Sequence, residues 1–110
     1  MSQSAESAVV VTTTLPDQAG ALELARELVE ARLAACVHVI PITSVYRWEG
    51  RLEEQAEWAC HVKTTVERVP ELFARIQSLH PYQVPEILTL PVGQGNPAYL
   101  KWVGESVRDS

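Results

Sequence analysis

Apolar and polar positions change their period several times along the chain, and each change predicts a new element. Residues 8–14, AVVVTTT, are apolar or β-branched and too few for a helix, so they predict a strand. Residues 15–35 then show helical spacing, with Asp17 in the N-cap position. The apolar stripe expected to face the core consists of Leu22, Ala25, Leu28, Val29 and Leu33.

A long hairpin is predicted next. The segment CVHVIPITSVYRW is typical of a strand, but Pro41 has no N–H to give to a ladder. We therefore expect the strand to bend or bulge there and to form two halves, Cys36 to Ile40 and Thr43 to Trp48. Glu49 and Gly50 supply a turn, after which RLEEQAEWACHVKT returns as an extended segment with a polar tip.

A second helical stripe follows in VERVPELFARIQSLH, where Pro70 fits only if it lies in the first turn. Its apolar positions are Val69, Leu72, Phe73, Ile76 and Leu79. After HPYQVP, the apolar EILTLPV predicts a fourth strand. Asn96 as N-cap and Pro97 as first helical residue predict a short C-terminal helix.

The predicted order β-α-β-β-α-β with an extra C-terminal helix indicates an α+β fold of the ferredoxin-like type, with both main helices on one face of the sheet. Residues 8–110 form one domain in this interpretation, and the polar leader 1–7 is expected to be disordered. The other sheet face and the long hairpin are left bare. We therefore expect an obligate oligomer that covers them.

Composition narrows the classes of partner. The chain has 110 residues, a formal net charge of −5 and 46% hydrophobic residues, which indicates a single ordinary globular core. The acidic balance disfavours nucleic acid, and the strand WACHVKT lacks the aromatic pattern of an RNA-recognition domain. No signal-peptide pattern and no apolar run of about 20 residues are present, so we expect a cytoplasmic protein without a membrane partner.

Several motifs, in order and spacing, resemble those of the CutA divalent-cation-tolerance proteins. They are ARLAACV, TSVYRWEG, KTT, LHPYQVPEI, LPV and GNPAYLKW. The resemblance runs from about Val9 to Val107 and implies a ferredoxin-like subunit of a tight homotrimer, similar in architecture to the PII nitrogen-regulatory proteins. It also implies a link to tolerance of copper and other divalent cations, for which direct binding has been proposed.

The resemblance does not imply an enzyme, because no reaction is established for the family. The residues agree, since the chain shows no nucleophile with an adjacent base, no glycine-rich phosphate loop and no acidic dyad. We therefore expect no catalytic site and no cofactor other than copper or another divalent cation.

Three residues are candidate metal ligands. Cys36 and His38 stand two apart in a predicted strand, so they face the same side and suit a soft cation such as copper. His80 matches the histidine of the HPY motif, although it would also suit the end of a helix as a partner of the helix dipole. Relatives with a proposed copper site carry a cysteine at Thr13 and a histidine at Leu79. This chain has neither, which reduces the ligand set implied by the resemblance to His80.

A second candidate site is a cleft between subunits. Pro81 ends the second helix and Pro85 keeps the chain extended, so Tyr82 and Glu86 are presented from a stiff connection. We hypothesise that these two side chains line a cleft for a small polar ligand together with Lys63, Trp48, Tyr99 and Trp102. The alternative function is thus a PII-like regulatory trimer that binds a small molecule or a protein. Aromatic residues at such positions also serve as packing anchors at interfaces.

Overall fold

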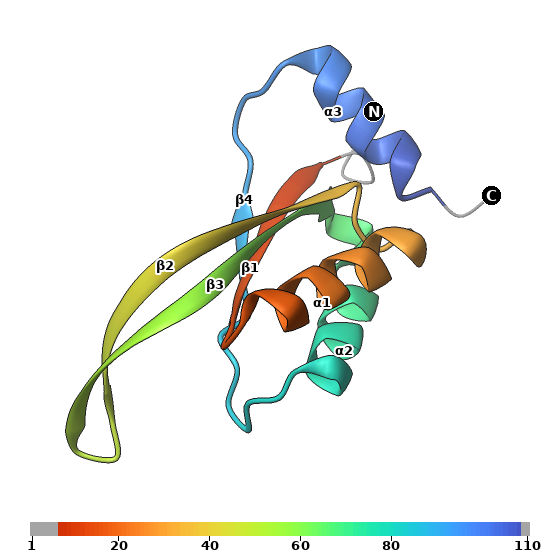
Figure 1. Ribbon diagram of the computed structural model, residues 1–110. Coiled ribbons are helices and arrows are strands. Elements are labelled where there is room, and N and C mark those ends of the chain that lie inside the picture. The colour runs from red at the N-terminus through yellow and green to blue at the C-terminus, as the bar shows by residue number, and fades with distance from the viewer. Residues whose placement is uncertain (1–6, 109–110) are drawn as a thin grey trace.

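The computed structural model describes residues 7–108. Its elements are β1 (Ala8–Leu15), α1 (Gln18–Glu30), β2 (Cys36–Trp48), β3 (Arg51–Thr65), a 3-10 turn η2 (Val66–Arg68), α2 (Val69–Leu79), β4 (Leu88–Pro91) and α3 (Pro97–Ser106). This order confirms the predicted α+β arrangement with an additional C-terminal helix (Figure 1). The predicted leader lies outside the described residues except for Ser7.

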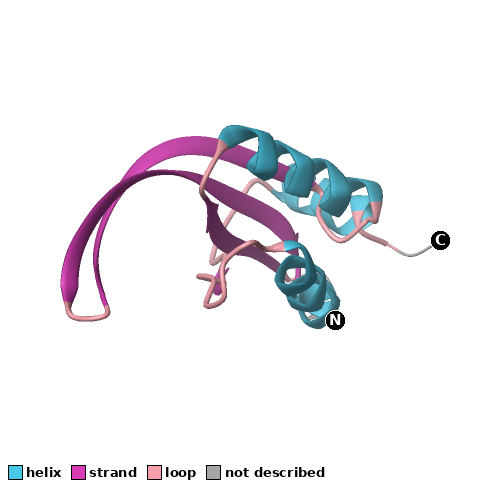
Figure 2. Ribbon diagram, turned by 60° about the horizontal axis from the view of Figure 1, so that its bottom comes forward, coloured by secondary structure: helices cyan, strands magenta, loops and turns pink. Residues whose placement is uncertain are grey.

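The four strands form one antiparallel sheet in the order β2-β3-β1-β4. Strand β3 is central and pairs with β1 along its second half and with β2 along its whole hairpin. Strands β1 and β2 are therefore separated by β3, which is the split β-α-β arrangement of the ferredoxin-like fold. Beyond β1, the β2–β3 hairpin continues without neighbours and curves away from the body of the protein (Figure 2).

The predicted bulge at Pro41, and the division of the strand into two halves there, are wrong. Pairing runs without a skipped residue from Cys36 opposite Lys63 to Trp48 opposite Arg51, with Pro41 opposite Trp58. Strand β2 lies at the sheet edge, where alternate N–H groups have no strand to pair with, so proline is tolerated there.

The turn that closes the hairpin has two residues, as predicted. Glu49 and Gly50 both have positive φ, 50° and 80°. Two successive left-handed residues are the requirement of the tight turn whose twist matches that of paired strands. The turn therefore fixes the register of the whole hairpin.

Local capping chemistry sets where the helices begin. Asp17 Oδ1 accepts a hydrogen bond from the Gly20 N–H at 2.7 Å, and Asn96 Oδ1 accepts one from the Ala98 N–H at 3.0 Å. Pro70 lies in the first turn of α2, where its missing N–H has no helical partner to lose. These three predicted helix starts are confirmed.

The core lies between the sheet and the two helices α1 and α2, which lie side by side (Figure 1). Its fully buried side chains include Val11, Leu28, Val62, Leu72 and Ile76. The predicted α1 stripe was partly misplaced, because the buried residues are Ala21, Leu24, Ala25 and Leu28, while Val29 is 43% exposed. Leu79 is likewise exposed at the end of α2. No helix in residues 7–108 has the length and apolar character needed to cross a membrane.

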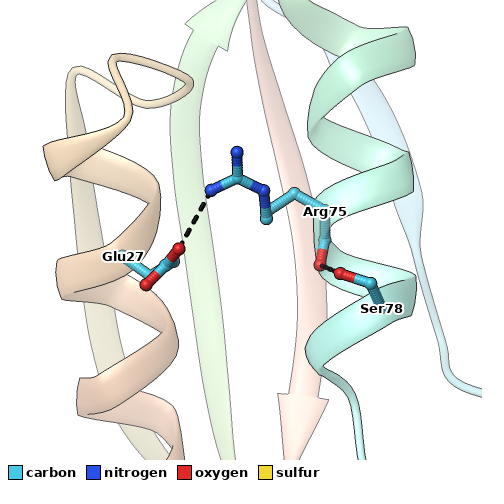
Figure 3. A network of polar contacts seen from close by, with 3 residues as sticks. All are labelled: Glu27, Arg75 and Ser78. Carbon is cyan, nitrogen blue, oxygen red and sulfur yellow. Dashed lines mark hydrogen bonds and ion pairs between the residues drawn. The ribbon is translucent and has the colours of Figure 1, made fainter.

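One ion pair joins the outer surfaces of the two helices. Arg75 Nη1 donates to Glu27 Oε2 at 3.0 Å, and the Arg75 carbonyl oxygen accepts from Ser78 Oγ at 2.9 Å (Figure 3). Both charged side chains are partly exposed, and ion pairs of this kind contribute little to stability. The apolar core is what holds α1 against α2.

A core substitution should show this difference. We expect Leu28→Ala to lower the free energy of unfolding by about 2–5 kcal/mol, because it removes a fully buried side chain and leaves a cavity. Val29→Ala, one position further on the exposed side of α1, should cost less than about 1 kcal/mol. Urea unfolding at one fixed protein concentration measures both, and equal costs would contradict the placement of the core.

Candidate functional site: the open face of the sheet

The strand register gathers polar side chains on the face that α1 and α2 leave open. His38 lies directly opposite His61, Cys36 directly opposite Lys63, and His61 is also opposite Thr12 of β1. Residues directly opposite one another in antiparallel strands have side chains on the same face. We call Cys36, His38, His61 and Lys63 the open-face cluster. Its neighbours in sequence, among them Val37, Val39, Cys60 and Val62, belong to the core on the other face.

Lysine and histidine make direct contact within this cluster. Lys63 Nζ lies 3.2 Å from His38 Nδ1. An ammonium group has no acceptor, so Lys63 donates and the Nδ1 lone pair accepts. In this arrangement His38 is the neutral tautomer that carries its proton on Nε2.

Helix α3 brings a phenol to the same place. Tyr99 OH lies 3.4 Å from Cys36 Sγ, and this hydrogen bond is the main reason why the pKa of Tyr99 is raised, with burial adding to it. The Tyr99 ring packs at a tilt against Trp102, with ring centroids 5.5 Å apart. Cys36 is half-buried, whereas Cys60 is buried in the core, where desolvation raises its pKa to about 11. Cys36 is thus the accessible thiol.

The predicted cleft residues are only partly brought together. Lys63 and Tyr99 lie at the cluster, and Glu86 reaches β1, where its Oε2 accepts from Thr12 Oγ1 at 2.9 Å. Trp48 lies beside the hairpin turn, twelve positions along β2 from Cys36, which is roughly 40 Å at the usual strand rise. One chain therefore does not place Trp48 at the same site.

His80 is held by two hydrogen bonds. Its Nδ1 accepts from the Tyr82 N–H at 3.1 Å, so the proton is on Nε2, which donates to the Thr14 carbonyl oxygen at 2.8 Å. His80 is the C-cap residue of α2, as its alternative interpretation predicted. Because its one lone pair is already used, a metal would have to break the bond to Tyr82.

Tyr82 contacts a residue that the sequence analysis did not single out. Its OH donates to Glu57 Oε2 at 2.7 Å, and Glu57 is only 7% exposed. Burial, followed by the hydrogen bond to Glu57 and its negative charge, raises the pKa of Tyr82. The available signal was a single carboxylate at the start of the apolar half of β3, EWACHV.

No group of three or more His, Cys, Asp or Glu side chains in residues 7–108 is arranged to hold a metal ion. The structure does bring Cys36 and His38 onto one patch, and it adds His61, which the sequence analysis had not joined to them. The two-residue turn contained this information, because it sets which residue of β3 lies opposite His38. A complete metal site would need further ligands or a rearrangement of side chains.

Comparison with known proteins decides the family. A family model described as CutA1 divalent ion tolerance protein matches residues 9–106, nearly the whole chain. The chain belongs to this family. The resemblance seen in the motifs is confirmed, and so is the α+β fold that it implied.

Curated CutA relatives are about half identical in sequence. A "Protein CutA homolog" of Xenopus laevis is 52% identical over 95 residues, 86% of this chain and 63% of that protein. A "Divalent-cation tolerance protein CutA" of Thermus thermophilus is 48% identical over 98 residues, 88% of this chain and 95% of that protein. The chain thus spans less than two thirds of the frog relative but nearly all of the bacterial one.

Solved CutA structures have the same fold. The Thermus thermophilus protein superposes with a TM-score of 0.87 at 47% identity and covers 90% of this chain and 97% of its own. CutA1 from Oryza sativa superposes with a TM-score of 0.91 at 36% identity and covers 98% and 100% of the two chains.

The bonding of His80 predicts a pH effect on stability. Desolvation lowers the pKa of His80 from its ordinary 6.5, against opposing contributions from the Thr14 carbonyl and Glu57. The folded state then binds the proton less readily than the unfolded state. This contribution to stability is present above pH 6.5 and is lost as pH falls through the folded pKa. The urea concentration at the unfolding midpoint should therefore fall from pH 7.5 to 6.5 and again to 5.5.

The variant His80→Gln tests the assignment, because an amide can still donate to Thr14 but does not titrate. We expect its midpoint to fall less between pH 7.5 and 5.5 than that of the unmodified chain. Identical pH dependence in both proteins would exclude His80 as a source of the effect. One protein concentration throughout keeps any assembly equilibrium comparable.

Proposed function

We propose that this protein acts in divalent-cation tolerance as a cytoplasmic homotrimer. In this proposal it binds a soft cation, with copper as the main candidate, through Cys36 and His38. The observation that carries the proposal is the patch that Cys36 and His38 of β2 share on the open face, with His61 of β3 directly opposite His38. Thiolate and imidazole ligands suit copper. The free thiols of Cys36 and Cys60 are compatible with a reducing compartment.

The open face supports assembly. Leu88 and Leu90 of β4 are 57% and 48% exposed on this face, and Val45 and Leu52 are exposed on the other side of the outer hairpin. Apolar surface and long unpartnered strands of this kind favour association with another subunit. Since one described chain offers no three-ligand group, we propose that a neighbouring copy supplies the remaining metal ligands.

Assembly is tested by a charge on the open face. We expect the unmodified chain to have about three times its 12.2 kDa mass in light scattering, and Leu90→Glu to shift the mass toward that of one chain. Leu79→Glu is the matched control, because Leu79 is equally exposed but lies at the end of α2 on the helix layer. A monomeric mass for the unmodified chain would refute the trimer.

Metal binding is tested by native mass spectrometry of the metal-free protein with added copper(I), copper(II) or zinc. We expect a fixed number of copper ions per assembly, and loss of this stoichiometric binding in the double variant Cys36→Ser, His38→Asn. Cys60→Ala, which removes the thiol on the core face, should leave copper binding unchanged. Stoichiometric binding that survives in the double variant would refute these ligands.

A second candidate function is a regulatory trimer that binds a small polar molecule at the same face. The observation that favours it is the contact of Lys63 with a neutral imidazole and not with a carboxylate. A cation placed in this way is suited to recognise an anionic ligand.

A further inference from the structure

We propose that Lys63, His38 and His61 form a binding site for a carboxylate or phosphate group on the open face of the sheet. The inference rests on the second candidate function and names its ligand class. It concerns the same cluster as the copper proposal but requires opposite chemistry.

The first argument is the polarity of the cluster. Lys63 uses one N–H on His38 Nδ1, which leaves it two further N–H groups. The accepting Nδ1 leaves the His38 proton on Nε2, which is a donor as well. His61 adds a third nitrogen-bearing side chain directly opposite His38. The cluster thus presents several donors, while the carboxylate of Glu86 at its border is bonded to Thr12 beside His61.

The second argument is the missing counter-charge. In a chain with a net charge of −5, Lys63 forms no ion pair with any residue between 7 and 108. Glu86, which the sequence analysis placed in one cleft with Lys63, is bonded to Thr12 instead. Lys63 is half-buried, and a cation withdrawn from water without a partner loses hydration free energy. An anion would restore that interaction.

The third argument is the form of the patch. Thr12 lies beside His61 with its hydroxyl donated to Glu86, and Tyr99 OH reaches Cys36 opposite Lys63, so hydroxyls border the cluster. Leu88 and Leu90 of β4, which the trimer proposal places against another copy, lie opposite Thr12 and Val10 and form an apolar border next to it. A small organic acid or phosphate ester, with one charged group and a less polar remainder, matches this arrangement.

The test uses the full chain with inorganic phosphate and with acetate as probes, followed by NMR of the backbone amides of β2 and β3 at constant ionic strength. We expect saturable shifts at the cluster, with affinity reduced about tenfold or more in Lys63→Gln, which is the loss of about one charge-assisted contact. Lys101→Gln is the matched control, because Lys101 is the other lysine of the chain and lies exposed on α3. It should bind as the unmodified chain does.

Sulfate, which keeps its charge between pH 7.5 and 5.5, serves as a third probe anion at constant pH.

Three outcomes would overturn the proposal. The first two are the absence of saturable shifts with all three anions and equal affinity in Lys63→Gln. If Lys63→Gln instead becomes monomeric while anions leave the unmodified chain unaffected, the cluster meets a carboxylate of another copy and the anion site is refuted. The copper result and the mass of the assembly are measured separately, so each proposal can fail alone.

Discussion

The antiparallel pairing of β3 with two neighbours is the constraint on which the rest of the structure depends. The two-residue turn sets the register between β2 and β3, and β3 in turn sets the register of β1 by pairing with it. Because side chains alternate, this register assigns Cys60 and Val62 to the core and His61 and Lys63 to the open face. A slip by one residue would exchange the two sets, placing a lysine and a histidine in the core.

One-sided coverage by helices explains the chemistry of the open face. The side chains there lie at the border between sheet and solvent, and they bond to one another in short pairs. Lys63 bonds to His38, Cys36 to Tyr99, and Thr12 to Glu86, each pair joining segments distant in sequence. The hydroxyl groups in the core lack such partners, since Thr13 and Thr64 are buried without a side-chain hydrogen bond among the described residues.

Sequence reasoning was most successful where local chemistry decides the outcome. Caps at Asp17 and Asn96 and the turn at Glu49 and Gly50 depend on neighbouring residues alone, and they were predicted correctly. The interruption at Pro41 was wrong because its tolerance depends on β2 being an edge strand, which is a property of the whole sheet.

The candidate site was harder to predict because its contacts join distant segments. Glu57 and Tyr82 are 25 positions apart, and His80 and Thr14 are 66 apart. The Cys36 and His38 pair followed from strand alternation, whereas the addition of His61 required the register. Glu86 bonds to Thr12, and Lys63 bonds to His38. The alternation of side chains along the strands does not predict these partners.

The hydrogen bonds of His38 and His80 determine which of these two histidines can more easily become a metal ligand. A neutral imidazole has a single lone pair, and in His80 it is held by a backbone N–H that shapes the HPY loop. In His38 it is held by Lys63, a flexible side chain that can move away. His38 is therefore the easier of the two to recruit. A metal at His38 must nevertheless displace the Lys63 ammonium. An anion would instead keep the ammonium at the cluster, so the two kinds of ligand exclude one another there.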